Sequence, residues 1–400
     1  MNKKTKCPCC SSREINNFIK SKNFPYFTTP IKVKEKKIIK KRNYSKYFDD
    51  LNYSFCNYCN HVFLISNPNL RVINKLYKYF YSYPSAMLGE FVPSRDNNFL
   101  DFLKFYLNKN KVFTSKTFYE IGSYDGYILY NLKKFGYKNV SGCDPSKGAE
   151  IAKKFNLKVD KIFFNINSSK YKNKKYDFII ARHLLEHITE PKKFLKDIKQ
   201  IMNENSKIIL EVPNGEFYLK NGLVEVFSHQ HIHLFNKFSM NELIKKLNLN
   251  IELIKESGAN IYFILSSKNY KKKFVKRNLI KNFIKKYHSK KKKIENIVNK
   301  YSNQNIIFFG AGGFCSAAIH LYKIKINKIK AILDSDSKKL GNQFLDIDIS
   351  IKNKEANIDK KSLLIITSYY TNDILKYLKR NKIYKNIMTI HPDVRLKKIR

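Results

Sequence analysis

The sequence contains no tryptophan and only 13 glycines in 400 residues, whereas lysine, isoleucine, asparagine, tyrosine and phenylalanine are abundant together. It also has no run that approaches the ~18 apolar residues of a membrane-spanning helix. The first residues, MNKKTKC, carry no apolar stretch behind the basic ones, which argues against a secretory signal. These absences argue against a membrane protein and predict a cytoplasmic location.

Acidic residues are scarce, because 32 Asp and Glu oppose 78 Lys and Arg and leave a formal net charge of +46. Such an excess normally points to nucleic acid or to an anionic surface. Here the charge is mostly lysine spread along the whole chain, as in proteins from AT-rich genomes, whereas a nucleic-acid surface is expected to be rich in arginine. We therefore expect a small-molecule partner rather than nucleic acid.

Seven cysteines are placed unevenly, with five of them in the first sixty residues. In a long chain without a signal sequence, this favours a metal site over disulfides. The two C-x2-C pairs are Cys7/Cys10 and Cys56/Cys59. Each pair places two thiolates on one tight turn, and two such turns make a tetrahedral zinc site. Cys9 competes with Cys10 as a ligand, and the absence of an open position predicts a structural rather than a catalytic zinc.

Residues 118–126, FYEIGSYDG, place an acidic residue and a tight glycine turn at the end of an apolar run. Gly122 and Gly126 let the backbone approach a ligand closely. A second apolar run ends at Asp144, where a carboxylate accepts hydrogen bonds from both ribose hydroxyls, as in dinucleotide folds. A glycine turn of an ordinary α/β domain is the simpler alternative. Together with Glu120, these residues favour a ligand that contains a nucleoside.

Short apolar runs alternate with helical patterns between residues 111 and 268. Strands are predicted at 117–121, 139–143, 158–164, 176–181, 207–212 and 260–266, and helices at 126–136, 146–155, 190–203 and 238–247. This alternation predicts an α/β fold with a mainly parallel sheet and helices on both faces. Ligands bind such sheets outside the carboxyl ends of the strands, which is where these motifs fall.

Composition and pattern divide the chain into five segments. They are a zinc-binding domain (1–65) with little helical periodicity, a helical connector (66–110), the α/β core (111–268), a lysine-dense linker helix (269–300) and a second Rossmann-like domain (301–400). In the last segment, a strand runs into the glycine turn FGAGG at 309–313, and the next strand ends at Asp334. In the connector, the aromatic stretch 81–84 either lines a substrate pocket or packs between domains.

Two histidine-rich stretches follow strand ends. The first is RHLLEH at 182–187, whose H-x-x-E-H spacing also occurs in inverted zinc proteases. Because it opens off a strand, we interpret Glu186 and His187 as pocket-shaping residues. The second is FSHQHIHLF at 227–235, in which three histidines alternate. This arrangement suits proton transfer. Metal binding and a polar loop are the alternatives, but no carboxylate alternates with the histidines.

The E-x-G-x-x-x-G turn followed by Asp144 resembles the first motif of class I S-adenosylmethionine (SAM)-dependent methyltransferases. With the cysteine pairs before it and the Rossmann-like domain behind it, essentially the whole chain resembles the three-domain sugar C-methyltransferases, which methylate nucleotide-linked deoxy-keto sugars. Two further pieces, residues 184–187 and 309–313, match as well. The family's active loop reads Tyr-x-Glu-His and then an aromatic pair, which falls here on residues 228–231 and 234–235.

The resemblance implies SAM as the cofactor and a nucleotide-sugar as the substrate. The cofactor-binding residues that follow are Glu120, Gly122, Tyr124, Gly126, Asp144 and His183. His231 would remove a proton α to a sugar ketone, while His229 or Gln230 would hold the enolate oxygen. On a sugar hydroxyl, the same base would give an O-methyl ether.

Two further functions stay open. An RNA methyltransferase would explain the positive charge. However, residues 182–187 lack the Asn/Asp-Pro-Pro-aromatic turn of enzymes that methylate nucleobase amines. A non-catalytic scaffold would retain the cofactor fold, and Ser228 and Gln230 stand where the family has its Tyr and Glu.

Overall fold

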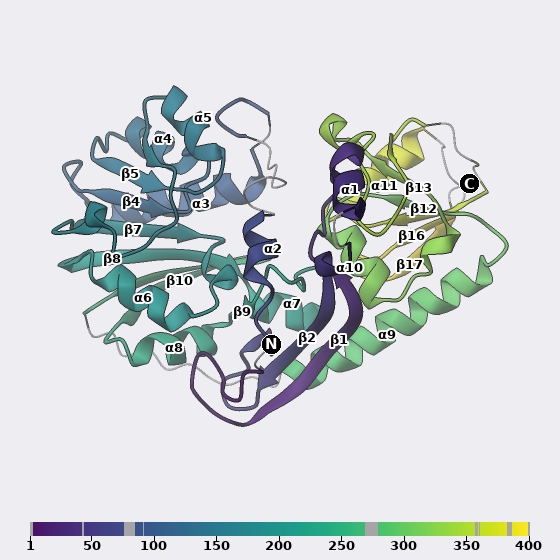
Figure 1. Ribbon diagram of the computed structural model, residues 1–400, viewed down its shortest axis with the longest axis horizontal. Coiled ribbons are helices and arrows are strands. Elements are labelled where there is room, and N and C mark those ends of the chain that lie inside the picture. The colour runs from purple at the N-terminus through teal and green to yellow at the C-terminus, as the bar shows by residue number, and fades with distance from the viewer. Residues whose placement is uncertain are drawn as a thin grey trace. The chain divides into compact units, whose positions relative to one another are not determined.

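The computed structural model describes residues 3–41, 44–75, 85–90, 92–268, 279–356, 359, 361–381 and 386–398. They belong to two compact units, many of whose elements are labelled in Figure 1. Unit 1 comprises Met1–Asn16, Ser54–Phe217 and Ile232–Arg277, and unit 2 comprises Asn17–Tyr53, Tyr218–His231 and Asn278–Arg400. The predicted α/β fold class is confirmed in both units.

The central element of unit 1 is a seven-stranded sheet in the order β10-β11-β8-β7-β4-β5-β6. Its strands are β4 (Phe118–Ile121), β5 (Val140–Cys143), β6 (Lys158–Asp160), β7 (Tyr176–Arg182), β8 (Met202–Pro213), β10 (Asn250–Ser257) and β11 (Asn260–Ser266). Neighbouring strands from β8 to β6 are parallel, and β11 runs antiparallel to both β8 and β10. The chain order reverses between β4 and β7, and such a reversal opens a ligand crevice at the carboxyl ends of the strands.

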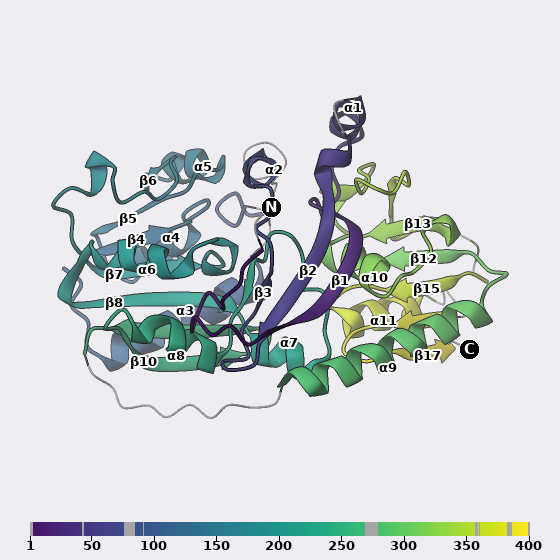
Figure 2. The same ribbon diagram turned by 60° about the horizontal axis from the view of Figure 1, so that its bottom comes forward.

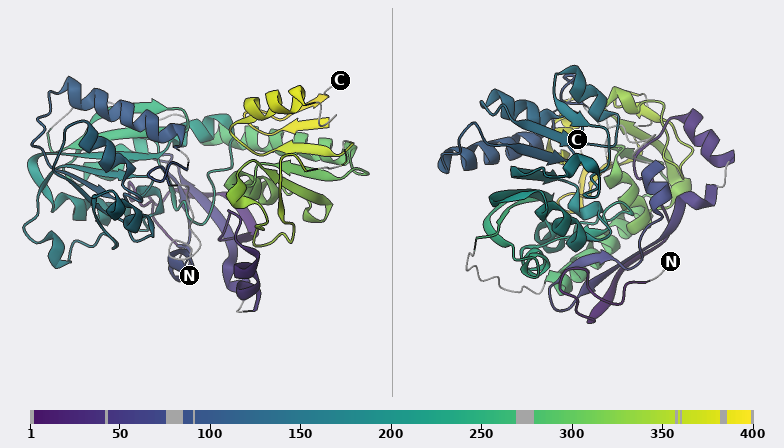
Figure 3. Two further views of the ribbon diagram at one scale, coloured as in Figure 1. Left: turned by 90° about the horizontal axis from the view of Figure 1, so that it is seen from above. Right: turned by 60° about the vertical axis from the view of Figure 1, so that its left-hand side comes forward.

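Helices cover both faces of this sheet. One face carries α3 (Ser94–Lys109), α4 (Tyr127–Lys134) and α5 (Gly148–Lys154), and the other carries α6 (Pro191–Lys199) and α8 (Lys237–Lys245). The left view of Figure 3 shows α3 lying along its face of the sheet. The ring of Phe99, in α3, lies 5.6 Å from the ring of Tyr262, in β11, between centroids. The regular spacing of apolar residues therefore produced the predicted layers.

A second, four-stranded sheet has the order β1-β2-β3-β9. Its strands are β1 (Ile15–Pro25), β2 (Phe48–Cys56), β3 (Val62–Leu64) and β9 (His233–Leu234). Three helices lie close to these strands in sequence, namely α1 (Val33–Lys41), α2 (Leu70–Lys75) and α7 (Gly215–Asn221). Helix α1 lies in the segment 1–65, whose sequence shows little helical periodicity. Its buried Lys36 donates to the backbone oxygen of Ile347 at 2.7 Å, so a lysine-rich segment packs as an ordered helix in unit 2.

Unit 2 contains a six-stranded sheet in the order β14-β13-β12-β15-β16-β17. Figure 2 labels β13, β12, β15 and β17 of this sheet. The strands are β12 (Ile306–Phe309), β13 (Ile329–Asp334), β14 (Ile351–Asn353), β15 (Leu363–Ile366), β16 (Asn386–Thr389) and β17 (Arg395–Lys398), accompanied by α9 (Leu279–Lys300), α10 (Gly313–Leu321) and α11 (Thr371–Arg380). The strands from β14 to β16 are parallel and β17 is antiparallel. This arrangement confirms the predicted second Rossmann-like unit.

Some predicted elements differ in extent or were missed. The helix expected to reach residue 203 ends at Lys199, because Met202 already begins the buried strand β8. The strand expected at 158–164 ends at Asp160. Strand β10 was missed because its polar residues lie on an edge. The aromatic stretch 81–84 and residues 269–278 lie outside the described residues. No helix in the described part of the chain is long and apolar enough to cross a membrane.

Candidate cofactor site and cysteine cluster

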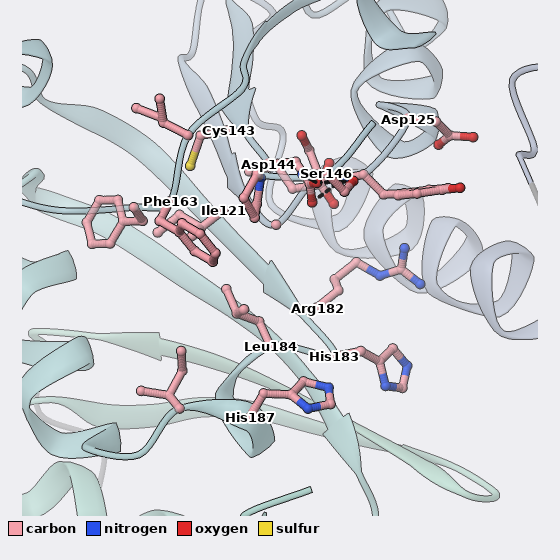
Figure 4. Close-up of a pocket in the computed structure, with 18 of the residues that line it drawn as sticks. Ile121, Asp125, Cys143, Asp144, Ser146, Phe163, Arg182, His183, Leu184 and His187 are labelled. Atoms are coloured by element: carbon pink, nitrogen blue, oxygen red, sulfur yellow. Dashed lines mark hydrogen bonds between the residues drawn. The ribbon is translucent and has the colours of Figure 1, made fainter. Parts of the chain in front are cut away.

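A cavity of about 410 Å³ opens at the carboxyl ends of β4, β5 and β7 in unit 1 (Figure 4). Five of the six residues predicted to bind the cofactor line it, namely Glu120, Gly122, Tyr124, Asp144 and His183. The sixth, Gly126, does not line the cavity. The strand reversal between β4 and β7 therefore brings together residues that are up to 63 positions apart, from Glu120 to His183.

The turn after β4 depends on glycine at two positions. Gly122 and Gly126 both have φ of +78°, which disfavours residues with a Cβ atom. A Cβ at Gly126 would also lie 2.6 Å from Cδ1 of Leu157, closer than two carbon atoms can approach. Gly126 therefore closes the turn against α5 and the strand behind it rather than touching a ligand.

Asp144 is buried at the end of β5 and fixes the same turn. Its Oδ2 accepts from the backbone N–H of Tyr124 at 3.0 Å, and its Oδ1 accepts from the N–H of Ser146 at 2.8 Å. The hydroxyl of Ser146 also donates to Oδ1. Each carboxylate oxygen has two lone pairs, so acceptor capacity toward the cavity remains. Asp144 is thus held in the place expected of a ribose acceptor.

Glu120 is a buried carboxyl at the wall of the cavity, with only 3% of its surface exposed. Burial raises its pKa to about 8, while the positive charge of Arg182 acts in the opposite direction. The nearby acidic groups Asp96, Asp125 and Asp144 add to the rise in pKa. The site therefore contains a carboxyl group that a cationic ligand would ionise.

A charged network follows β7 and was missed by sequence reasoning. The Arg182 guanidinium donates from Nε to Glu211 at 2.6 Å and from Nη2 to Asp96 at 2.7 Å. His183 lies next to it, with its two ring nitrogens each 3.3 Å from a carboxylate, Glu186 on one side and Glu211 on the other. Burial lowers the pKa of His183, but these carboxylates raise it above the ordinary value. The two carboxylates therefore engage both ring nitrogens of His183 and fix the ring at the wall of the cavity.

The other wall of the cavity is apolar. Phe163 lines it with 59% of its surface exposed, and Figure 4 shows it near Ile121 and Cys143. A flat aromatic ring at the edge of a nucleoside site offers a stacking surface for a purine. The sequence signal for this residue is the aromatic pair after Asp160, which was hidden inside a strand predicted to reach residue 164.

Asp125, inside the glycine turn, is a second residue that sequence reasoning passed over. Its Oδ2 accepts from the hydroxyl of Ser85 at 2.8 Å and from the N–H of Met87 at 3.1 Å. Its Oδ1 accepts from the N–H of Tyr127 at 3.2 Å. Asp125 therefore links the cofactor turn to the segment 85–90, from which Ala86 lines the cavity.

The two cysteine pairs of unit 1 form one cluster. Sγ of Cys7 lies 3.6 Å from that of Cys59, and Sγ of Cys10 lies 3.5 Å from that of Cys56. A tetrahedron of Zn–S bonds of ~2.3 Å has sulfur–sulfur edges of about 3.8 Å, close to these distances. Cys10 rather than Cys9 joins the other three sulfurs, while Cys9 packs in the core.

The two cysteine turns repeat one geometry. In the first knuckle, residues 7–12, Ser11 has φ of +67° and its N–H donates to the backbone oxygen of Cys7 at 2.9 Å. In the second knuckle, residues 56–61, Asn60 has φ of +54° and its N–H donates to the backbone oxygen of Cys56 at 2.9 Å. Two equal turns with four converging sulfurs fit a structural zinc ion.

The residues predicted to be catalytic, His229, Gln230 and His231, belong to unit 2. His231 Nδ1 lies 2.7 Å from the backbone oxygen of Val226, so this nitrogen donates and the lone pair is on Nε2. His229 is buried, and its Nε2 donates to the backbone oxygen of Phe24 at 3.1 Å. Burial lowers the pKa of His229 to about 4. This geometry favours a structural part for His229.

Comparison with known proteins finds similarity in the middle of the chain. A family described as a methyltransferase domain matches residues 94–254, beginning at the first residue of α3. The tRNA U34 carboxymethyltransferase of Campylobacter curvus is 24% identical over 134 residues, which are 31% of this chain and 45% of that protein. The chain thus spans less than half the length of this relative.

Solved structures of methyltransferases are also similar to part of this chain. A SAM-dependent methyltransferase from Clostridium acetobutylicum is 13% identical with a TM-score of 0.35, covering 49% of this chain and 96% of that chain. A magnesium protoporphyrin IX methyltransferase from Synechocystis is 14% identical with a TM-score of 0.34, covering 42% of this chain and 81% of that chain. From the family match and the sheet described above, residues 94–254 are a class I SAM-dependent methyltransferase domain, and the predicted enzyme class is confirmed for this domain.

Proposed function

We propose that the chain transfers a methyl group from SAM to a sugar, most simply a nucleotide-linked keto-deoxysugar. The observation that carries the proposal is the cavity of unit 1, in which Glu120, Gly122 and Asp144 meet at the carboxyl ends of adjacent parallel strands. SAM supplies an electrophilic methyl group on a sulfonium. The sugar as acceptor rests on the resemblance of the whole chain to sugar C-methyltransferases.

The residues of the cavity have separate parts in binding. Asp144 accepts hydrogen bonds from the ribose, and Phe163 offers its exposed ring to the adenine. Glu120 ionises beside the positive charges of the cofactor, since its raised pKa leaves it largely protonated without them at neutral pH. His183, whose ring is fixed between Glu186 and Glu211, forms part of the wall against which the cofactor lies.

The proposed base is His231. Its Nδ1–H donates to the backbone oxygen of Val226, which places the acceptor lone pair on Nε2. Nε2 takes the proton α to the ketone and leaves an enolate, and Gln230 donates from its amide to the enolate oxygen. The carbon–carbon bond forms as the sulfur–methyl bond breaks, and that electron pair stays on sulfur. A hydroxyl deprotonated by the same base would give the O-methyl ether instead.

A panel of nucleotide-linked keto-deoxysugars, incubated with SAM and analysed by mass spectrometry, tests the proposal. Exchange of the α proton in D₂O distinguishes the two products, because enolate formation exchanges this proton and O-methylation does not. We expect methylation and exchange with wild type and neither with His231→Ala. Wild-type protein that binds SAM but methylates no sugar would favour the scaffold alternative.

RNA is the second candidate substrate, since the relative from Campylobacter curvus carries a tRNA activity in its name and this chain has a net charge of +46. An RNA substrate predicts tight binding that weakens steeply with salt. A filter-binding titration of total tRNA at two salt concentrations measures this. Weak binding at physiological salt would count against RNA.

A further inference from the structure

The second knuckle, residues 56–61, is bonded directly to the segment that follows His231 in the chain. His61 Nε2 lies 3.0 Å from His233 Nδ1, and both rings are fully buried in unit 1. Just beyond the knuckle, the N–H of Leu64 donates to the backbone oxygen of Ile232 at 2.9 Å, and β3 pairs with β9. The chain on the carboxyl side of His231 is therefore fixed by the cysteine turn.

Asn236 strengthens this attachment because its side chain has two functions. Its Nδ2 donates to the backbone oxygen of Asn60 at 2.9 Å, inside the second knuckle. Its Oδ1 accepts from the N–H of Ser239 at 2.8 Å and so caps helix α8. Asn236 is buried, and it joins the knuckle to the start of α8 in unit 1.

The amino side of the histidine loop (residues 227–235) is held by the strand that leads into the same knuckle. Tyr53 lies in β2, three residues before Cys56, and is fully buried. Its hydroxyl lies 2.8 Å from the backbone oxygen of Ser228 and also contacts that of His231. Residues 53–61 therefore hold the loop on both sides of His231. The same residues include Cys56 and Cys59 of the cysteine cluster.

We infer that metal in the cysteine cluster fixes the position of the histidine loop, with Tyr53, His61 and Asn236 as positioning residues. A metal ion would join the second knuckle to the first through sulfurs that already lie 3.5 and 3.6 Å apart. Binding free energy at such a site becomes folding free energy for the turns that carry the ligands. The effect of this coupling on catalysis rests on the proposed function of His231 as the base, whereas the coupling itself does not.

Hydrogen exchange of the full chain, followed by mass spectrometry, tests the coupling. Zinc is removed with a chelator and then restored, and peptides covering 53–66, 226–240 and 118–143 are compared. We expect removal to speed exchange in the first two regions by about tenfold or more, because local opening controls exchange there. The cofactor strands at 118–143 should stay protected, and zinc should restore the loop where magnesium does not.

Two variants separate loop positioning from general loss of folding. Asn236→Ser retains a good helix cap but loses the donor to the knuckle, whereas Asn236→Ala loses both. In zinc-loaded Asn236→Ser, we expect unchanged zinc content and unchanged protection at 53–66, with faster exchange at 226–240. Tyr53→Phe, which removes only a hydroxyl, should give the same result. Methyl transfer should show a lower kcat with the KM for SAM unchanged.

Wild-type exchange at 226–240 in both zinc-loaded Asn236→Ser and zinc-loaded Tyr53→Phe would overturn the inference. So would a chelated wild-type protein that loses its zinc, keeps 118–143 protected and shows no change in the loop. If coupling is seen but no sugar is methylated, the proposed function fails and the inference stands. If sugars are methylated but removal of zinc leaves the loop as protected as before, the proposed function stands and the inference fails.

Discussion

Glu120 is the residue whose charge state most directly affects the cofactor cavity. Its folded-state pKa of about 8 is above that of an ordinary glutamate, mainly because the side chain is buried. Protonation of Glu120 therefore stabilises the folded protein fully at low pH, and this contribution is lost as the pH rises toward 8. A bound cation shifts the balance, since it favours the carboxylate.

We expect SAM affinity to rise between pH 6.5 and 8.5 as Glu120 ionises, by about tenfold if the cation lowers its pKa by one unit. Calorimetric titration at several pH values measures this rise. In Glu120→Gln the increase should be smaller, because only the titration of SAM itself remains. Equal pH profiles for the two proteins would remove Glu120 from cofactor binding.

His229 affects the stability of the fold in the opposite direction as the pH changes. Its folded-state pKa of about 4 is below the usual 6.5, so the fold favours the neutral ring. This contribution is fully present above pH 6.5 and is lost as the pH falls toward 4. A shift of this size corresponds to about 3 kcal/mol.

We therefore expect the urea midpoint of wild type to fall from pH 7 to pH 4.5 by more than that of His229→Gln, which retains a donor but does not titrate. Circular dichroism follows the unfolding. His288→Gln, at an exposed position of α9, is the control and should behave as wild type. If His229→Gln lost as much stability on acidification as wild type, the buried ring would not be the source.

At the scale of elements, the glycine turn after β4 is the most constrained connection. Gly126 has a left-handed backbone, and a Cβ there would meet Leu157 at 2.6 Å. Gly258, in the turn between β10 and β11, is also left-handed with φ of +56° but has nothing within 4 Å of its Cβ position. Replacing either glycine therefore carries the free-energy cost of a left-handed backbone, and replacing Gly126 adds a steric clash.

Gly258→Ala should cost about 1 kcal/mol, the left-handed penalty alone. Gly126→Ala should cost about 1–3 kcal/mol more from overpacking, and should weaken SAM binding because the turn moves. Denaturant unfolding and calorimetry measure the two effects. Equal destabilisation by both substitutions would show that the contact with Leu157 relaxes without cost.

For the whole molecule, the sequence predicted most of the layers but fewer of the contacts. The alternation of apolar runs and glycine turns predicted both Rossmann-like sheets, because their buried parallel strands are short and strongly apolar. The edge strand β10 and helix α1 escaped, because their polar composition hides the few residues that pack. Sequence patterns therefore predict elements whose residues are buried at regular intervals, and they miss polar elements such as a strand at the edge of a sheet.

The sequence likewise predicted only part of the candidate site. Glu120, Gly122 and Asp144 follow from local motifs, and the structure brings them to one cavity. Arg182 and Glu211 did not follow, because their partnership depends on the pairing of β7 with β8. Asn236 likewise acts through a turn 176 residues away in sequence. Such long-range partners carry no signal in a single sequence.

The two Rossmann-like units also provide a matched pair of aspartates. Asp334 is the last residue of β13, and its carboxylate accepts from the N–H groups of Ala311 and Asp336 at 2.7 and 2.9 Å. Asp144 accepts from Tyr124 and Ser146 in the same pattern. Replacing either aspartate removes similar structural bonds, but only Asp144 lies in the cofactor cavity.

The most direct test is calorimetric binding of S-adenosylhomocysteine to zinc-loaded wild type, Asp144→Ala and Asp334→Ala. We predict micromolar binding to wild type and to Asp334→Ala, and affinity weakened about 10- to 100-fold in Asp144→Ala, as expected for a lost charged acceptor. Failure of folded wild type to bind, or equal binding by Asp144→Ala, would contradict the assignment of the cavity to SAM.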